Sequence, residues 1–208
     1  MIPKNQTFQP VKRQPLLIVI SGPSGVGKDT VVERMEASGL PFHFVITATD
    51  RPPRKGETDG VDYFFVSTEE FERMIAEDEL IEYAIVYGEY KGIPKWQVRQ
   101  AMVTNKDVVM RIDVQGAATI REKYPQALLI FLTTGDEAEL IDRLEGRGTE
   151  SPDDLQRRIE KVRDEMEQVD LFDYVVPNLD GKLDQTVETI AAIIRAEHHR
   201  LPHRKVSL

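Results

Sequence analysis

The residues best suited to chemistry lie in a glycine-rich segment that runs from Gly22 to Thr30. Its glycines allow a tight backbone turn that can point successive N–H groups at a phosphate chain, and the helix expected to follow adds its positive N-terminal end. Lys28 supplies a cation for β- and γ-phosphates. The sequence therefore predicts a nucleotide phosphate site formed by Gly22, Pro23, Ser24, Gly25, Val26, Gly27, Lys28, Asp29 and Thr30.

Two acids near this segment raise the question of a metal ion. A phosphate-binding loop usually has Ser or Thr directly after its lysine to hold Mg²⁺, but this chain has Asp29 there and a hydroxyl one residue later, at Thr30. Asp29 is more simply explained as a first-turn acid stabilised by the helix dipole. Asp113 follows an apolar run and could hold a metal through water, cap the next helix, or do both. We expect Mg²⁺ to be held by Thr30 and Asp113.

A second group of phosphate-binding candidates lies in the polar segment 51–63. Arg51 and Arg54 are separated by two prolines, which stiffen the loop and restrict the relative direction of the two side chains. Two guanidinium groups can hold the oxygens of one phosphate, and Tyr63 can add a hydroxyl. Loop arginines are more often solvated charges, but this spacing in a chain with a phosphate-binding loop favours a second phosphate site.

The hydrophobic pattern predicts the elements that position these residues. Apolar runs at 16–20, 108–112 and 127–133 are typical of buried strands, and each is followed by a segment with helical spacing. A long amphipathic helix is expected over 155–169, and helix caps are expected at Ser67 and Thr134. This alternation predicts an α/β fold with a mostly parallel central sheet flanked by helices.

Composition excludes several classes of protein. The 208 residues include 27 Lys and Arg against 36 Asp and Glu, a net charge of −9, which disfavours a nucleic-acid partner. The chain has no cysteine, which excludes disulfides and thiolate sites and fits a reducing compartment. No apolar run is long enough to cross a bilayer. We therefore expect a cytoplasmic protein without a membrane partner.

Over residues 16–197 the chain resembles the guanylate kinase family. Six signatures occur in the family's order: the glycine-rich segment 22–28, Arg51-Pro52-Pro53-Arg54 with Gly56-Glu57, Gly60-Val61-Asp62-Tyr63, Ile81-Glu82-Tyr83-Ala84, Ile112-Asp113-Val114-Gln115-Gly116 and Arg143-Leu144-Glu145-Gly146-Arg147-Gly148. The resemblance implies a P-loop NTPase fold with an inserted GMP-binding segment at about 47–95 and a lid at about 137–157. A flexible lead-in at 1–15 and a basic, frayed tail at 198–208 would flank this domain.

The resemblance also implies a reaction: direct, in-line transfer of the γ-phosphoryl of ATP to GMP, and to dGMP, with Mg²⁺ present. Glu82 suits guanine, because one carboxylate can accept hydrogen bonds from both the ring N–H and the exocyclic amine, whereas adenine presents an acceptor at the ring position. The implied substrate-binding residues are Thr47, Arg51, Arg54, Tyr63, Glu82, Lys91 and Asp113. The implied catalytic residues are Lys28, Arg51, Arg143, Arg147 and Arg158, with Asn178 near the adenine.

The chain departs from the family's pattern at some of these positions. Lys91 and Ile93 stand where members usually have tyrosine and a hydroxyl residue, Asp50 replaces a hydroxyl residue, and Arg111 replaces an acid. These changes put the details of guanine recognition in question. Taken without the resemblance, the lid arginines are ordinary helix-surface charges, and Arg143 could pair with a glutamate four residues back.

Two other functions remain open at this level, a ribose bisphosphate kinase of the same superfamily and a non-catalytic module that binds a protein partner. The base-reading residues Thr47 and Glu82 argue against the first, because a sugar phosphate needs no base reader. The retained Lys28 and arginines argue against the second. The protein is expected to be a monomer or a homodimer.

Overall fold

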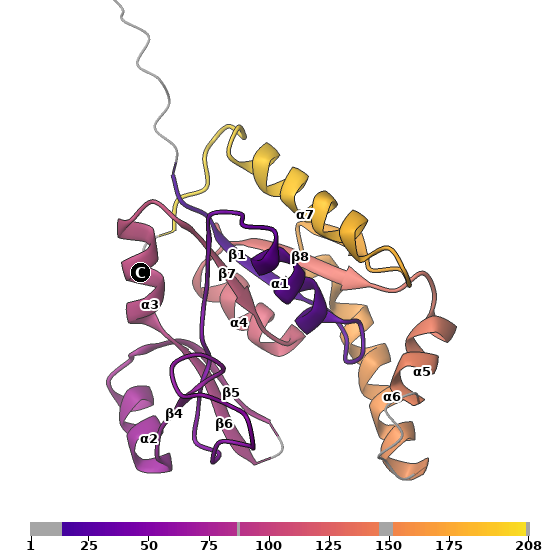
Figure 1. Ribbon diagram of the computed structural model, residues 1–208, viewed down its shortest axis with the longest axis horizontal. Coiled ribbons are helices and arrows are strands. Elements are labelled where there is room, and N and C mark those ends of the chain that lie inside the picture. Colours follow the sequence, from indigo (N-terminus) through magenta and orange to yellow (C-terminus); the bar gives the residue numbers. More distant parts are fainter. Residues whose placement is uncertain (1–13, 87, 146–151, 207–208) are drawn as a thin grey trace, which may run out of the picture.

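A parallel sheet forms the centre of the protein. The computed structural model describes residues 14–86, 88–145 and 152–206 (Figure 1). Within them a five-stranded sheet has the order β2-β7-β1-β8-β9, and every neighbouring pair is parallel. Its strands are β1 (Leu17–Ser21), β2 (Phe42–Phe44), β7 (Asp107–Arg111), β8 (Leu128–Thr133) and β9 (Tyr174–Pro177). The predicted mostly parallel sheet is confirmed.

Helices cover both faces of this sheet because successive residues of β1 point to opposite sides. Leu16, Ile18 and Ile20 belong to one hydrophobic cluster, and Leu17 and Val19 belong to another. The first cluster includes residues of α1 (Lys28–Ala37), α5 (Glu137–Glu145), α6 (Pro152–Glu167) and α7 (Leu183–Glu197). The second includes residues of α3 (Lys95–Val103) and α4 (Val114–Lys123).

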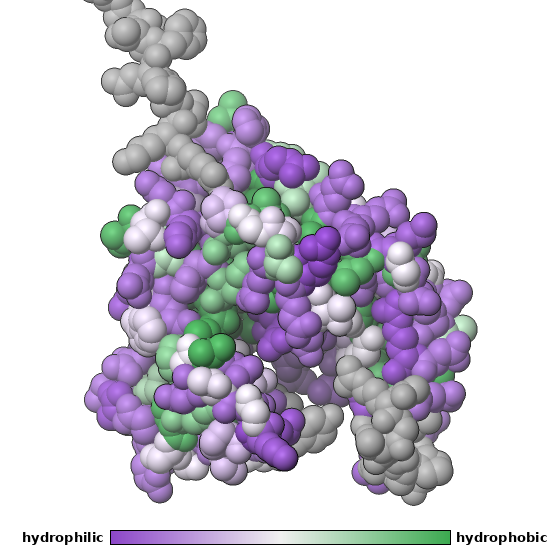
Figure 2. All heavy atoms as spheres, viewed as in Figure 1, coloured by the Kyte–Doolittle hydropathy of each residue, from purple (hydrophilic) through white to green (hydrophobic). Residues whose placement is uncertain are grey.

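A smaller sheet stands beside the central one. It has four strands in the order β4-β3-β6-β5 and is covered by α2 (Thr68–Ala76). Its strands are β3 (Ala48–Thr49), β4 (Phe64–Phe65), β5 (Leu80–Val86) and β6 (Glu89–Pro94). The space-filling view is hollowed between this sheet and the side of the molecule formed by α5 and α6 (Figure 2).

The two predicted helix caps have different outcomes, and one strand was not predicted at all. The predicted cap at Ser67 is confirmed, since its hydroxyl accepts a hydrogen bond from the Glu70 N–H at 3.1 Å. The predicted cap at Thr134 is wrong: the Asp136 carboxylate accepts the corresponding bond from the Glu139 N–H at 2.8 Å. The pattern also did not predict β6, whose glycine, proline and charged residues are poor strand formers.

The expected fraying of the C-terminal tail is also wrong for the residues that the structure describes. The Arg204 side chain is 6% exposed, and its guanidinium donates to Glu197 at 2.6 Å and to the Ala127 carbonyl at 3.0 Å. The tail is therefore packed against the end of α7 and the start of β8. Most of the expected N-terminal lead-in and part of the expected lid lie outside the described residues.

Candidate active site

The glycine-rich segment forms a tight loop between β1 and α1. Gly22 has φ +144°, and a Cβ added there would lie 2.4 Å from the Leu132 carbonyl oxygen. Gly27 has φ +90°, and a Cβ there would lie 2.7 Å from the Asn178 side-chain nitrogen. Both positions therefore require glycine, because a side chain would meet strain and a clash at once. The loop precedes the N-terminus of α1, where backbone N–H groups and the helix dipole favour an anion.

Lys28 is folded back on this loop. Its Nζ donates to the carbonyl oxygens of Gly22 at 2.7 Å and Pro23 at 2.9 Å. Burial lowers the pKa of Lys28, and the carboxylates of Glu165, Asp29 and Asp113 oppose that shift. The lysine is thus placed at the mouth of the loop with its ammonium group held by hydrogen bonds.

A glutamate that the sequence analysis missed supports the loop from α6. Glu165 is 7% exposed, and its carboxylate accepts a hydrogen bond from the Ser24 N–H at 3.0 Å. Arg158, one of the predicted catalytic arginines, donates to the Ser24 hydroxyl at 2.9 Å. The available signal was the position of Glu165 three residues after buried Val162 and beside Met166, on the apolar side of the predicted helix.

Two further predicted residues lie behind the loop. Asn178 is 6% exposed and donates from its side chain to the Val26 carbonyl at 2.8 Å. Arg143 donates to the Asn178 carbonyl at 2.8 Å and pairs with Glu139, four residues back. Arg143 thus makes the helix-surface pair foreseen for it and also contacts the loop's support. Arg147 lies outside the described residues.

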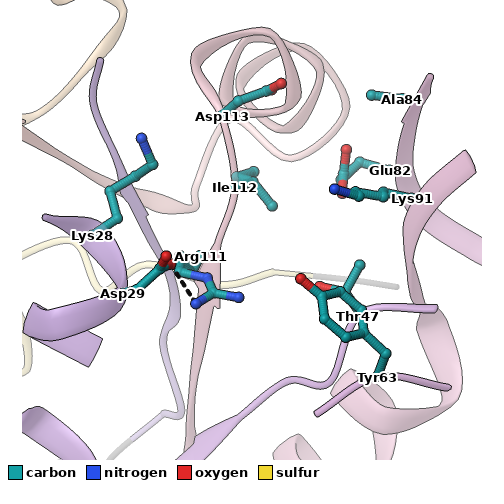
Figure 3. A pocket seen from close by; sticks show the side chains of 10 residues that line it. All are labelled: Lys28, Asp29, Thr47, Tyr63, Glu82, Ala84, Lys91, Arg111, Ile112 and Asp113. Atoms are coloured by element: carbon teal, nitrogen blue, oxygen red, sulfur yellow. Dashed lines mark hydrogen bonds and ion pairs between the residues drawn. The ribbon is translucent and has the colours of Figure 1, made fainter. Parts of the chain in front are cut away.

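The substrate-binding candidates come together around a cavity of about 230 Å³. Figure 3 shows Lys28 and Asp29 on one side of it and Tyr63, Glu82 and Lys91 on the other. Its lining residues are Lys28, Asp29, Thr47, Tyr63, Glu82, Ala84, Lys91, Arg111, Ile112 and Asp113. Of the predicted substrate-binding residues, Arg51 and Arg54 are absent from this lining.

Glu82 is the most perturbed acid of the cavity. It is 5% exposed, and burial, followed by the charge of Asp113, raises its pKa to about 8. The chain passes close to it on α4: a Cβ added to Gly116 would lie 2.9 Å from a Glu82 carboxylate oxygen. A buried acid with a raised pKa in a cavity is a strong candidate for binding a donor-rich ligand.

The two arginines predicted to bind one phosphate have different environments. Arg51 is 6% exposed, and its two terminal nitrogens donate to the two carboxylate oxygens of Glu57 at 2.7 and 2.6 Å. These bonds hold the pKa of Glu57 at about 2. The Arg51 guanidinium also lies 4.7 Å from the centre of the Tyr63 ring. Arg54, by contrast, is exposed.

Comparison with known proteins decides the family. A family model described as guanylate kinase matches residues 14–197. The chain belongs to the guanylate kinase family. It is 49% identical to guanylate kinase 2, chloroplastic/mitochondrial, of Oryza sativa subsp. japonica, over 94% of this chain and 69% of that protein. It is 44% identical to a guanylate kinase of Caldanaerobacter subterraneus subsp. tengcongensis, over 94% of each.

Solved structures agree with this assignment. The crystal structure of guanylate kinase from Anaplasma phagocytophilum matches with a TM-score of 0.72 and 28% identity, over 91% of this chain and 89% of that one. The P-loop fold predicted for this guanylate kinase is confirmed. None of the helices in the part of the chain that the structure describes has the length and apolar character of a bilayer span.

The two predicted metal ligands do not both line the cavity, whereas most of the substrate-binding candidates do. Asp113 lines the cavity, and one of its carboxylate oxygens caps α4 by accepting from the Gly116 N–H at 2.8 Å. Thr30 is exposed in the first turn of α1. No group of three or more acids or histidines suited to a metal occurs among the described residues. Mg²⁺ commonly relies on one or two protein oxygens together with water and substrate phosphates, and the guanylate kinase has oxygens of that kind here.

Proposed function

We propose that this guanylate kinase transfers the γ-phosphoryl group of ATP to GMP, and also to dGMP, giving ADP and the nucleoside diphosphate. The observation that supports this most strongly is the buried carboxylate of Glu82, which faces the same cavity as Lys28 of the P-loop. One wall thus has a receptor for a base rich in N–H donors, and the opposite wall has the cation expected at the donor phosphates.

Guanine would be bound by Glu82 and Thr47, with Asp113 nearby. Guanine offers two adjacent donors to the carboxylate, whereas adenine would place an acceptor against a buried acid and leave it unsatisfied. The phosphate of GMP would then extend towards Tyr63, Lys91 and Arg51. Arg51 must share its donors between Glu57 and the phosphate, while the exposed Arg54 is free to close on it.

Transfer itself would depend on positioning and on charge. The donor phosphates would occupy the P-loop, and Lys28 would turn from the loop carbonyls to their oxygens. Arg143, Arg147 and Arg158 would neutralise charge that develops on the transferring group. Thr30 and Asp113 would hold Mg²⁺, which when bound neutralises phosphate charge and orients the donor chain. Cytoplasmic location and the monomeric or homodimeric state stay predictions.

An assay of ADP release tests the proposal. The protein, ATP and Mg²⁺ would be offered GMP, dGMP, AMP, UMP or ribose 1,5-bisphosphate separately. We expect turnover with the guanine nucleotides alone, and Glu82→Gln should lose or redirect it. Turnover with ribose 1,5-bisphosphate would instead indicate the sugar kinase, and ATP binding without any turnover would contradict catalysis.

A further inference from the structure

Arg111 occupies a central place in the active site that its position in the sequence did not reveal. It ends β7 and lies in register with Ile20 of β1, two residues before Gly22. It lines the 230 Å³ cavity and also a neighbouring cavity of about 310 Å³. In the described part of the chain it is the one cation that lines both of these cavities.

The guanidinium of Arg111 is held from one side. Its Nη1 donates to the carboxylate of Asp29, the residue directly after the P-loop lysine. Figure 3 shows the other terminal nitrogen directed away from Asp29, on the side of the Tyr63 hydroxyl. A guanidinium has five N–H donors in a planar fork, so pairing with one carboxylate leaves donors for a second anion.

The two arginines predicted to bind this phosphate, Arg51 and Arg54, do not line the 230 Å³ cavity. Arg51 is neutralised by a two-point ion pair with Glu57 and does not line the 230 Å³ cavity. Arg54 is exposed on its loop. Arg111 lies between Lys28 and Tyr63 (Figure 3), which is the region that the acceptor phosphate must enter to meet the donor phosphates.

We propose that Arg111 binds the phosphate of GMP and that Asp29 positions its guanidinium for this purpose. The inference rests on the proposed function and adds a phosphate ligand to it. It also joins two departures that the sequence shows separately, the acid after the P-loop lysine and the base at the end of β7. The positive charge of Arg111 offsets the negative charge of Asp29, so the pair repels the incoming phosphates less than an unpaired acid would.

The experiment compares GMP with guanosine, which has the same base and no phosphate. The dissociation constant of GMP and the inhibition constant of guanosine would be measured for the wild type, Arg111→Ala, Arg111→Lys and Asp29→Asn. We expect Arg111→Ala to weaken GMP binding about 10- to 100-fold, the range of a charged hydrogen bond, and to leave guanosine unchanged. Arg111→Lys should lose less, because a point charge remains.

The role of Asp29 is tested by combining variants. Asp29→Asn should weaken GMP binding several-fold, by about the strength of a partly exposed ion pair. In the Arg111→Ala background, where Asp29 has lost this partner, the same change should not weaken binding further and should restore part of it, because it removes an acid that repels the phosphate. Arg34→Ala is the matched control, since Arg34 also lies on α1 and forms an exposed ion pair, with Asp184 at 2.6 Å. This control should leave GMP affinity unchanged.

Two results would overturn the inference. One is unchanged GMP affinity in Arg111→Ala, and the other is an equal loss for GMP and guanosine, which would indicate a structural role. Arg111→Lys keeps the comparison possible if the alanine variant does not fold. Failure of the proposed function is distinct, because in that case the wild type itself would show no GMP turnover.

Discussion

The two halves of the active site are built in different ways. On the P-loop side the backbone makes the site, and glycines that accept no side chain are packed against Leu132 and Asn178. On the acceptor side the candidate groups are side chains, and Glu82 and Lys91 lie on a small sheet whose core is formed by Ala48, Phe71, Met74 and Leu80. The P-loop half is shaped by backbone geometry and close packing, and the acceptor half is shaped by charged side chains that need partners.

This difference affects what each half responds to. Backbone N–H groups do not titrate, so the donors of the phosphate loop keep their function over a wide pH range, although burial lowers the pKa of Lys28 beside them. On the proposed acceptor side, Glu82 has a pKa of about 8 and Arg51 is paired with Glu57. Base selectivity, and the pH dependence of GMP binding near pH 8, are therefore expected to arise on the acceptor side.

The largest effect is expected from Lys28→Met. The change removes the cation at the donor phosphates, so kcat should fall about 10²- to 10³-fold, as it does when one transition-state donor is removed. GMP affinity should change by less than about three-fold, because the charge acts on the other substrate. ADP release and calorimetric titration with GMP would separate the two. A large loss of GMP affinity would contradict the assignment of Lys28 to the donor side alone.

The second largest effect is expected from Arg51→Ala, and it should exceed the effect of Arg54→Ala. Arg51→Ala removes a buried guanidinium and leaves Glu57 facing the phosphate, so kcat/KM for GMP should fall about 10- to 100-fold. Arg51→Ala with Glu57→Gln should recover part of that loss, since the unpaired acid is gone. Arg54→Ala should cost less than about five-fold, because an exposed charge is screened. Equal losses at both arginines would contradict this ranking.

The pH dependence of KM for GMP tests whether Glu82 is the titrating group of the acceptor side. Only ionised Glu82 can accept two hydrogen bonds from guanine, and with a pKa of about 8 the ionised fraction rises with pH. KM for GMP should therefore fall roughly eight-fold between pH 7 and pH 8.5, above the second phosphate pKa near 6. Glu82→Gln should abolish this slope, while KM for ATP should stay level. A flat profile in the wild type would contradict the raised pKa.

The smallest effect is expected from Gly116→Ala. The added Cβ would lie 2.9 Å from a Glu82 oxygen, 3.3 Å from the Ile112 Cβ and 3.4 Å from an Asp113 oxygen. The carboxylate must shift, so KM for GMP should rise a few-fold. Alanine also favours the helix by about 1 kcal/mol, so the thermal unfolding temperature should not fall. A drop in the unfolding temperature without a change in KM would indicate that the added methyl group disturbs the packing of the core and does not displace the Glu82 carboxylate.

Local features were readable in the sequence because their causes are local. A strand, closely spaced glycines and a following helix lie within a few residues of one another, so the P-loop and the parallel sheet followed from residue types and spacing. The family's signatures also brought Glu82, Thr47, Tyr63, Lys91 and Asp113 to notice, and these do line one cavity. The roles assigned to them remain predictions.

Contacts between distant residues were decided only by the tertiary structure. Glu165 meets Ser24 across 141 positions, and Arg111 meets Asp29 across 82. The tail is packed because Arg204 finds Glu197 and the Ala127 carbonyl, and its basic composition gave no sign of that. Residue type states which charges exist, but burial and pairing depend on which chain segments meet. The sequence by itself therefore determined the phosphate loop and the family, while the fold decided which carboxylate is buried and which arginine lines the cavity.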